Sequence, residues 1–247
     1  MSDTKVLLVH GAWHGAWCWE DNWVPHLSEH GFDVNTIELH DPATPGSKKR
    51  IWTRMSTYVD RVRQELDRLG PETIVVGHSM GGLVAQRALE KSTAKGMVLV
   101  ASVPHTGVAP ATFRTLRRLP GPTLAAISTL NMWRLVATPA LARADFFTDE
   151  TPQHTVESTH QRLQNESYTA YLSMMLRRPR PTSVSAPTLV IAAQHDPLFP
   201  VAEQAALAAK YGTEAAVIEG AGHDIMLDDG WEQAADLAIE WIEQLDG

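Results

Sequence analysis

Short apolar runs recur along this chain, and most are followed by a segment whose apolar positions have helical spacing. Runs of four to six aliphatic residues without polar alternation are typical of strands that are buried on both faces, as in a parallel sheet. The expected strands are residues 6–9, 32–39, 72–76, 96–101, 188–193 and 214–218, and the clearest expected helices are 57–69, 82–89, 202–211 and 231–245. Because strands and helices alternate, we predict an α/β fold with a mainly parallel sheet of about six strands flanked by helices.

The alternation is interrupted between residues 104 and 187. Nine of the 15 prolines fall there, and helical pieces such as 124–135 and 168–176 are separated by loops without a buried-strand run. We interpret residues 104–187 as a helical cap inserted after the fourth strand, with residues 1–103 and 188–247 forming the α/β core. A separate small helical domain is the alternative, but the strand pattern resumes at residue 188, which favours insertion into one domain.

Composition narrows the class of partner. Hydrophobic residues make up 44% of the 247 positions and charged residues 20%, as in ordinary globular proteins. The net charge of −8 argues against a nucleic acid or an anionic membrane as partner. The single cysteine, Cys18, cannot form an intrachain disulfide. Residues 1–5 lack the pattern of a leader peptide and no apolar run has the length of a membrane span, so we expect neither feature. We therefore expect a cytoplasmic protein acting on a small molecule; whether it is a homodimer stays open.

The segment 77–81, Gly-His-Ser-Met-Gly, lies between an expected strand and an expected helix. In this context G-x-S-x-G indicates a sharp turn that holds a nucleophilic serine, Ser79, above the sheet edge, with glycines two positions before and after it for steric reasons. The backbone N–H of Met80, at the start of the helix, is suited to stabilise an oxyanion. The alternative is a glycine-rich turn in which the serine is incidental.

A serine hydroxyl needs a base, and the base needs a carboxylate. Asp196 and His223 each follow an expected strand, so with Ser79 they meet at one edge of a parallel sheet, in the chain order serine, acid, histidine that is typical of α/β-hydrolases. Asp196 could instead only cap a helix before Pro197, and His223 could be an ordinary surface residue. No carboxylate follows the strand at 96–101, which favours Asp196. No metal-ligand spacing is visible, and we expect no metal and no cofactor.

The loop after the first strand should supply the second oxyanion donor, and we assign it to the N–H of Ala12. Apolar side chains near the mouth of the site and in the cap indicate a small, mainly apolar substrate, although a residue of this type taken singly more often belongs to the core than to a pocket. These candidate substrate-binding residues are Trp13, Phe113, Trp133, Phe146, Met174, Leu198 and Ile225.

The sequence resembles the α/β-hydrolase superfamily in its run His10 to Trp19, in the serine turn at 77–82, and in His195-Asp196 and Gly222-His223. The doubled His-Gly-Ala-Trp run is similar to the branch that holds methylesterases and other hydrolases of small carboxylic esters, together with the hydroxynitrile lyases. The resemblance implies a six-stranded sheet and a serine carboxylesterase with the triad Ser79, His223 and Asp196.

Two positions differ from the lyase pattern, in which a threonine follows the first histidine and a lysine follows the catalytic histidine. Here these positions hold Gly11 and Asp224, and an anionic Asp224 would oppose a leaving cyanide, which favours hydrolysis. Two alternatives remain. One is another chemistry on the same triad, such as that of a C–C bond hydrolase, lactonase, thioesterase, cyclase or lyase, and the other is a receptor-like binding protein that retains the triad.

Overall fold

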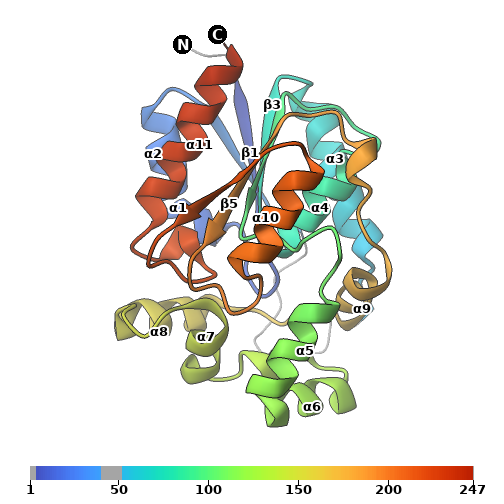
Figure 1. Cartoon of the computed structure of the whole chain (residues 1–247), viewed down its shortest axis with the longest axis vertical. Coiled ribbons are helices and arrows are strands. Elements are labelled where there is room, and N and C mark those ends of the chain that lie inside the picture. Colours follow the sequence, from blue (N-terminus) through green and yellow to red (C-terminus); the bar gives the residue numbers. More distant parts are fainter. Residues whose placement is uncertain (1–3, 40–51, 247) are drawn as a thin grey trace.

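The computed structural model describes residues 4–39 and 52–246. Its centre is a six-stranded, fully parallel sheet with the strand order β2-β1-β3-β4-β5-β6 (Figure 1). The strands are β1 (Lys5–Val9), β2 (Asp33–Ile37), β3 (Thr73–His78), β4 (Gly96–Val100), β5 (Thr188–Ala193) and β6 (Ala215–Ile218). The predicted fold class and the six strands are confirmed.

Successive residues of a strand point to opposite faces, and both faces of this sheet are covered. Leu7 and Val9 enter one hydrophobic cluster, whereas Val6 and Leu8 enter a second cluster on the other face. This arrangement explains why β1 is apolar at consecutive positions instead of alternating.

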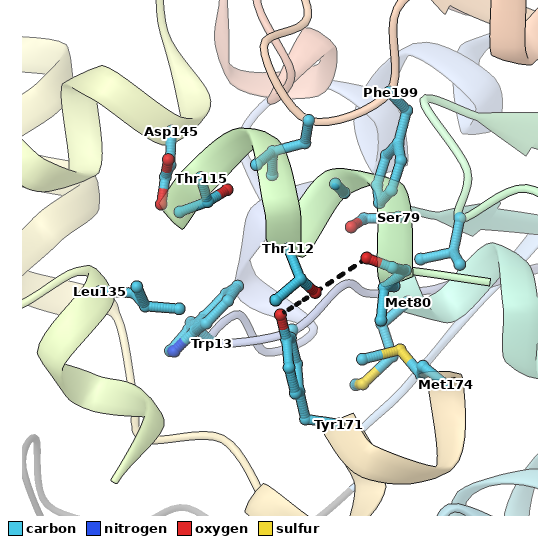
Figure 2. Close-up of a pocket in the computed structure, with 15 residues that line it drawn as sticks. Trp13, Ser79, Met80, Thr112, Thr115, Leu135, Asp145, Tyr171, Met174 and Phe199 are labelled. Carbon is cyan, nitrogen blue, oxygen red and sulfur yellow. Dashed lines mark hydrogen bonds between the residues drawn. The ribbon is translucent and has the colours of Figure 1, made fainter. Parts of the chain in front are cut away.

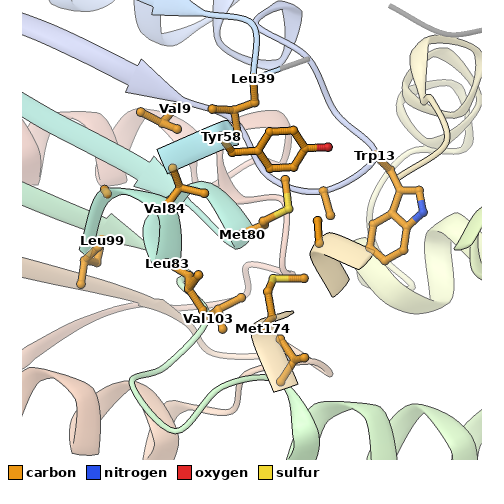
Figure 3. Close-up of a cluster of buried hydrophobic side chains, with 14 of the residues drawn as sticks. Val9, Trp13, Leu39, Tyr58, Met80, Leu83, Val84, Leu99, Val103 and Met174 are labelled. Atoms are coloured by element: carbon orange, nitrogen blue, oxygen red, sulfur yellow. The ribbon is translucent and has the colours of Figure 1, made fainter. Parts of the chain in front are cut away.

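Helices form the outer layers of the sheet (Figure 1). The first cluster is covered by α3 (Met55–Leu69), α4 (Met80–Ala88) and α10 (Val201–Lys210), and part of it is drawn in Figure 3. The second cluster is covered by α1 (Trp17–Glu20), α2 (Trp23–Glu29) and α11 (Trp231–Asp246). Cys18, on α1, is a free and buried thiol.

The strand order reverses at β1, which creates the crevice where open α/β sheets bind ligands. From β1 the chain moves outward to β2 and then returns to β3 on the other side of β1. Val9 pairs with Gly77, so the loops that follow β1 and β3 begin at the same edge. Ala193 pairs with Ile218 in the same way, and the loops after β5 and β6 therefore begin at that edge too.

Between β4 and β5 the chain forms helices that lie beyond this edge or beside it (Figure 1). The first cluster continues without a break from the sheet into residues of these helices, among them Leu135, Phe146, Val156 and Met174. The segment 104–187 therefore shares its apolar core with the sheet. Its helices are α5 (Ala109–Arg118), α6 (Pro120–Thr129), η1 (Met132–Leu135), α7 (Pro139–Phe146), α8 (Gln153–Arg162), α9 (Tyr168–Leu176) and η2 (Pro181–Ser183).

Most of the predicted strands and helices begin or end one or two residues away from the observed boundaries. The helical piece expected at 124–135 is divided, because Leu130 adopts a left-handed conformation (φ 51°) that ends α6. Helices usually end this way at glycine or asparagine, so a leucine gives no warning. The helix expected from Thr57 already begins at Met55. The prolines and the glycine between residues 40 and 54 predict a loop that exposes the basic triplet Lys48-Lys49-Arg50. Residues 40–51 are outside the described residues. No helix among the described residues is long and apolar enough to cross a membrane.

Candidate active site

The serine turn joins the end of β3 directly to the start of α4. Ser79 is the single residue between them and has φ 52° and ψ −118°, a conformation that residues with a side chain rarely adopt. A Cβ on Gly77 would lie 2.7 Å from the carbonyl oxygen of Gly81, and one on Gly81 would lie 2.3 Å from that of Val9. Both positions therefore require glycine.

Hydrogen bonds hold Ser79 in this conformation. Its N–H donates to the carbonyl oxygen of Val100 (3.1 Å), and its own carbonyl oxygen accepts from the N–H of Val103 (3.0 Å). Strained backbone of this kind persists where the surrounding structure fixes it, and it is concentrated at functional sites.

His223 and Asp196 meet at the same edge of the sheet. Nδ1 of His223 donates to Oδ2 of Asp196 over 2.7 Å, and both side chains are buried. Oδ1 of Asp196 accepts from the backbone N–H groups of Leu198 (2.7 Å) and Phe199 (2.9 Å). The N-cap of α10 is Pro200, so Asp196 does not cap that helix; its carboxylate is fixed by a turn and faces the histidine.

The surroundings of His223 favour its charged form. Burial alone would lower its pKa, but the carboxylates of Asp196, Asp224 and Asp145 together raise the pKa of His223 above the ordinary value. A histidine base with a raised pKa takes up a proton more readily, which suits general base chemistry near neutral pH.

The loop after β1 is held by a side chain that sequence reasoning overlooked. Nδ1 of His14 donates to the carbonyl oxygen of Ala12 (2.8 Å), and Nε2 of His14 lies 2.9 Å from Oδ2 of Asp224. His14 and Asp224 are fully buried. Trp13, between Ala12 and His14, has φ 63°. The repeated histidine of the His-Gly-Ala-Trp run is the only sequence signal for this arrangement.

The structure corrects the argument that Asp224 faces the substrate. Its carboxylate is bound by His14 and is 0% exposed, and Asp224 does not line the cavity described below. The backbone N–H of Asp224 donates to the carbonyl oxygen of Phe146 (3.0 Å), which ties this loop to α7.

His78 has a structural position. Its Nε2 donates to the carbonyl oxygen of His223 (3.1 Å), and burial, reinforced by His223 and His14, lowers the pKa of His78 well below its ordinary value. Side-chain atoms of His78, His223 and Asp224 that could bind a metal ion lie within 4.8 Å of one another, and this is the one such grouping in the described part of the chain. Since the two histidines already donate to protein acceptors, we interpret this grouping as part of the hydrogen-bond network.

A small cavity of about 50 Å³ lies over Ser79 (Figure 2). Ala12 and Met80, the two expected oxyanion donors, line it together with Ser79. Three of the predicted substrate-binding residues also line it: Trp13, Met174 and Leu198.

The other four predicted substrate-binding residues do not line this cavity. Phe113 is 59% exposed, because α5 turns that position to the solvent. Ile225 is buried in the cluster on the opposite face of the sheet, and Trp133 packs at the edge of the first cluster against His160. Phe146 is buried behind the cavity, where its ring contacts those of Trp13, His14 and His223.

The cavity also contains polar side chains that sequence reasoning missed. They all come from segment 104–187, where no sequence pattern indicates which way a helix faces. They are Thr112 and Thr115 of α5, Asp145 of α7 and Tyr171 of α9, and the hydroxyls of Thr112 and Tyr171 are hydrogen-bonded at 2.6 Å.

Comparison with known proteins identifies the family to which the chain belongs. Residues 6–237 match the family described as "Alpha/beta hydrolase family". The chain is 35% identical over 113 residues to Methylesterase 3 of Arabidopsis thaliana, covering 42% of each chain. It is 32% identical over 100 residues to Methyl jasmonate esterase 1 of Vitis vinifera, covering 40% of this chain and 38% of the relative. The match thus spans less than half of the length of these relatives.

Solved structures share the fold over nearly the whole chain. A methylesterase from Arabidopsis has a TM-score of 0.70 at 21% identity, covering 96% of this chain and 99% of the other. A thermophilic esterase from Thermogutta terrifontis has a TM-score of 0.68 at 21% identity, covering 98% and 90%. At this identity the likeness concerns the fold.

Proposed function

Because the chain belongs to the α/β-hydrolase family, we propose that it is a serine hydrolase that cleaves a small, mainly apolar carboxylic ester. The observation that carries the proposal is the buried hydrogen bond of 2.7 Å between His223 and Asp196, at the edge where Ser79 stands in its strained turn. The largely apolar cavity over Ser79 supports the choice of substrate, and the esterases among its relatives support the choice of reaction.

In the proposed reaction, Oγ of Ser79 attacks the ester carbonyl carbon while Nε2 of His223 takes the hydroxyl proton. Asp196 holds the ring through Nδ1 and stabilises its positive charge. The N–H groups of Ala12 and Met80 bind the oxyanion of the tetrahedral intermediate. His223 then gives its proton to the departing alcohol, which leaves an acyl group on Ser79. Water, deprotonated by His223, then attacks the acyl carbon, and the bond to Oγ of Ser79 breaks as His223 returns the proton to Oγ, which releases the acid and restores the serine.

Gly11 favours hydrolysis over the lyase reaction. A Cβ at this position would lie 3.0 Å from Cβ of Ser79 and 2.8 Å from Nδ1 of His78. The residue before the oxyanion donor is therefore packed against the nucleophile without a side chain, and a threonine at this position would have to displace one of these groups.

The test is a burst assay with 4-nitrophenyl acetate and butanoate, together with labelling by a fluorophosphonate and mass spectrometry. We expect one nitrophenol per active site in the burst and one label on the peptide that contains Ser79. Both should disappear in Ser79→Ala and persist in Ser128→Ala, a matched serine on the exposed surface of α6. A wild-type protein that shows neither burst nor label would refute the proposed function.

A further inference from the structure

One wall of the cavity carries a carboxylate that the proposed reaction does not use. Asp145, near the end of α7, lines the cavity and is 1% exposed. In Figure 2 it is drawn beside the cavity at a distance from Ser79, on the same side of the view as Thr115. The lining around these two residues is mainly apolar.

Only one oxygen of this carboxylate is engaged. Oδ1 of Asp145 accepts a hydrogen bond from Nη2 of Arg118, whose side chain is one-third exposed and belongs to the last turn of α5. Neither Oδ2 of Asp145 nor the hydroxyl of Thr115 has a hydrogen-bond partner among the described residues. Because Asp145 lines the cavity, its second oxygen is left to a ligand or a water molecule there, and a carboxylate in such an apolar site is stabilised by every hydrogen bond it accepts.

The position of Thr115 follows from helical spacing. Ala111, Thr112 and Thr115 of α5 line the cavity together with Val108, the residue just before this helix, at intervals of three and four residues. Of the hydroxyls on this face, that of Thr112 already donates to the carbonyl oxygen of Val108 (2.8 Å) and pairs with Tyr171. Thr115 and Asp145 are thus the polar groups of the cavity wall that are free to bind a ligand.

We propose that Asp145, assisted by Thr115, binds a hydroxyl group of the substrate, so that the preferred ester carries a hydroxyl remote from the ester group. This inference rests on the proposed function, because it assigns the part of the substrate that Ser79 does not touch. It makes Asp145 a specificity-determining residue of the cap.

A neutral donor fits this position better than a cation. Arg118 already supplies a positive charge to Asp145, and a second cation in the same buried space would be repelled by the guanidinium. His223, which becomes positively charged during the reaction, also acts on this carboxyl electrostatically. Burial raises the pKa of Asp145 to about 6 even though Arg118 and His223 oppose the shift, so the carboxylate is ionised and able to accept a hydrogen bond above that pH.

The experiment compares paired esters that differ only in a terminal hydroxyl. In one series, the methyl ester of a straight-chain acid with four to eight carbons is paired with the methyl ester of the acid that carries a terminal hydroxyl. In the other series, the acetate of a straight-chain alcohol of the same length is paired with the monoacetate of the diol. For wild type we expect the hydroxylated member to have a higher kcat/KM by about 10- to 100-fold at one chain length of one series, as a hydrogen bond to a charged group supplies. Equal kcat/KM within every pair would overturn the subsite.

Two variants separate substrate binding from a purely structural role of the ion pair. Asp145→Leu removes the acceptor and should bring the ratio of the two kcat/KM values within each pair to about one, because only the hydroxylated ester makes the lost contact. The readout is this ratio, since the Asp145 carboxylate also acts on the pKa of His223 and its loss can change the rate on both esters. Arg118→Gln breaks the same ion pair but keeps the carboxyl group, and it should keep the preference. If both variants slow both esters equally, Asp145 only joins α7 to α5 and the proposal is wrong.

The outcomes distinguish this inference from the proposed function. Wild type that hydrolyses paired esters equally would refute the subsite alone, whereas wild type that hydrolyses none and takes no fluorophosphonate label would refute the function. Thermal unfolding of each variant checks the fold. If Asp145→Leu does not fold, Asp145→Ser, which leaves a shorter polar group, takes its place with the same expected loss of preference.

Discussion

The His14–Asp224 pair offers a quantitative test of how this site is held together. Nε2 of His14 and Oδ2 of Asp224 are 2.9 Å apart and the two side chains are 1% and 0% exposed, so water cannot solvate the Asp224 carboxylate if His14 is removed. His14→Phe, which keeps a ring of similar shape, leaves the Asp224 carboxylate buried and uncompensated, and this should lower the free energy of unfolding by about 3–5 kcal/mol. The chain provides a matched control in His26 and Asp236, which are 2.7 Å apart but have side chains 16% and 50% exposed. For His26→Phe we expect a cost of about 1 kcal/mol or less, as for other exposed pairs.

Urea unfolding followed by the fluorescence of the eight tryptophans measures these differences. With a slope of about 3 kcal/mol per molar urea, His14→Phe should lower the midpoint by roughly 1 to 1.7 M. The double variant His14→Phe/Asp224→Leu should recover a large part of the loss, because no isolated charge is left. Two results would refute the reasoning. One is a midpoint for His14→Phe equal to that of His26→Phe. The other is a double variant whose loss of unfolding free energy equals the sum of the losses in His14→Phe and Asp224→Leu.

Three further predictions concern the catalytic edge. Because His223 must be neutral to accept a proton and its pKa is raised above 6.5, kcat/KM should fall as the pH drops through a value above 6.5; a profile flat to pH 4 contradicts this base. Gly11→Ala places a Cβ 3.0 Å from Cβ of Ser79, and displacement of the nucleophile should lower kcat/KM by roughly 10- to 100-fold. An unchanged kcat/KM in steady-state assays would show that the side chains around Gly11 move aside without cost. Gly81→Ala brings a Cβ to 2.3 Å from the carbonyl oxygen of Val9. Because backbone cannot move aside like a flexible side chain, thermal unfolding should show that the free energy of unfolding falls by about 3 kcal/mol or more. A melting temperature equal to that of the wild type would contradict the packing of this turn.

The features that sequence could predict are local. The strands are identified by consecutive apolar residues, and the turn at Ser79 by glycines whose spacing follows from steric limits within five residues. The positions of Ser79, Asp196 and His223, each after an expected strand, predict that the three residues meet, because parallel strands bring their carboxyl ends to one edge of the sheet. This rule places loops and leaves the contacts between their side chains undetermined.

The features that sequence could not predict depend on contacts between distant segments. His14 and Asp224 are 210 positions apart, and nothing near Asp224 shows that its partner is a histidine instead of a substrate. In the cap, the face that α5 presents to the cavity depends on how the whole segment packs. For this reason the sequence predicts a substrate contact for Phe113, which faces the solvent, and gives no sign that Asp145 lines the cavity.

The continuity of the hydrophobic cluster from the sheet into the cap has an evolutionary consequence. Apolar cap residues such as Phe146, Val156 and Met174 also support the sheet, so a substitution that reshapes the cavity through them is simultaneously a substitution in the core of the fold. Such changes are tolerated only while the protein keeps enough stability to fold. New specificities should therefore arise more readily at Thr115 and Asp145, whose side chains line the cavity without belonging to the shared cluster, than at the apolar residues that surround them.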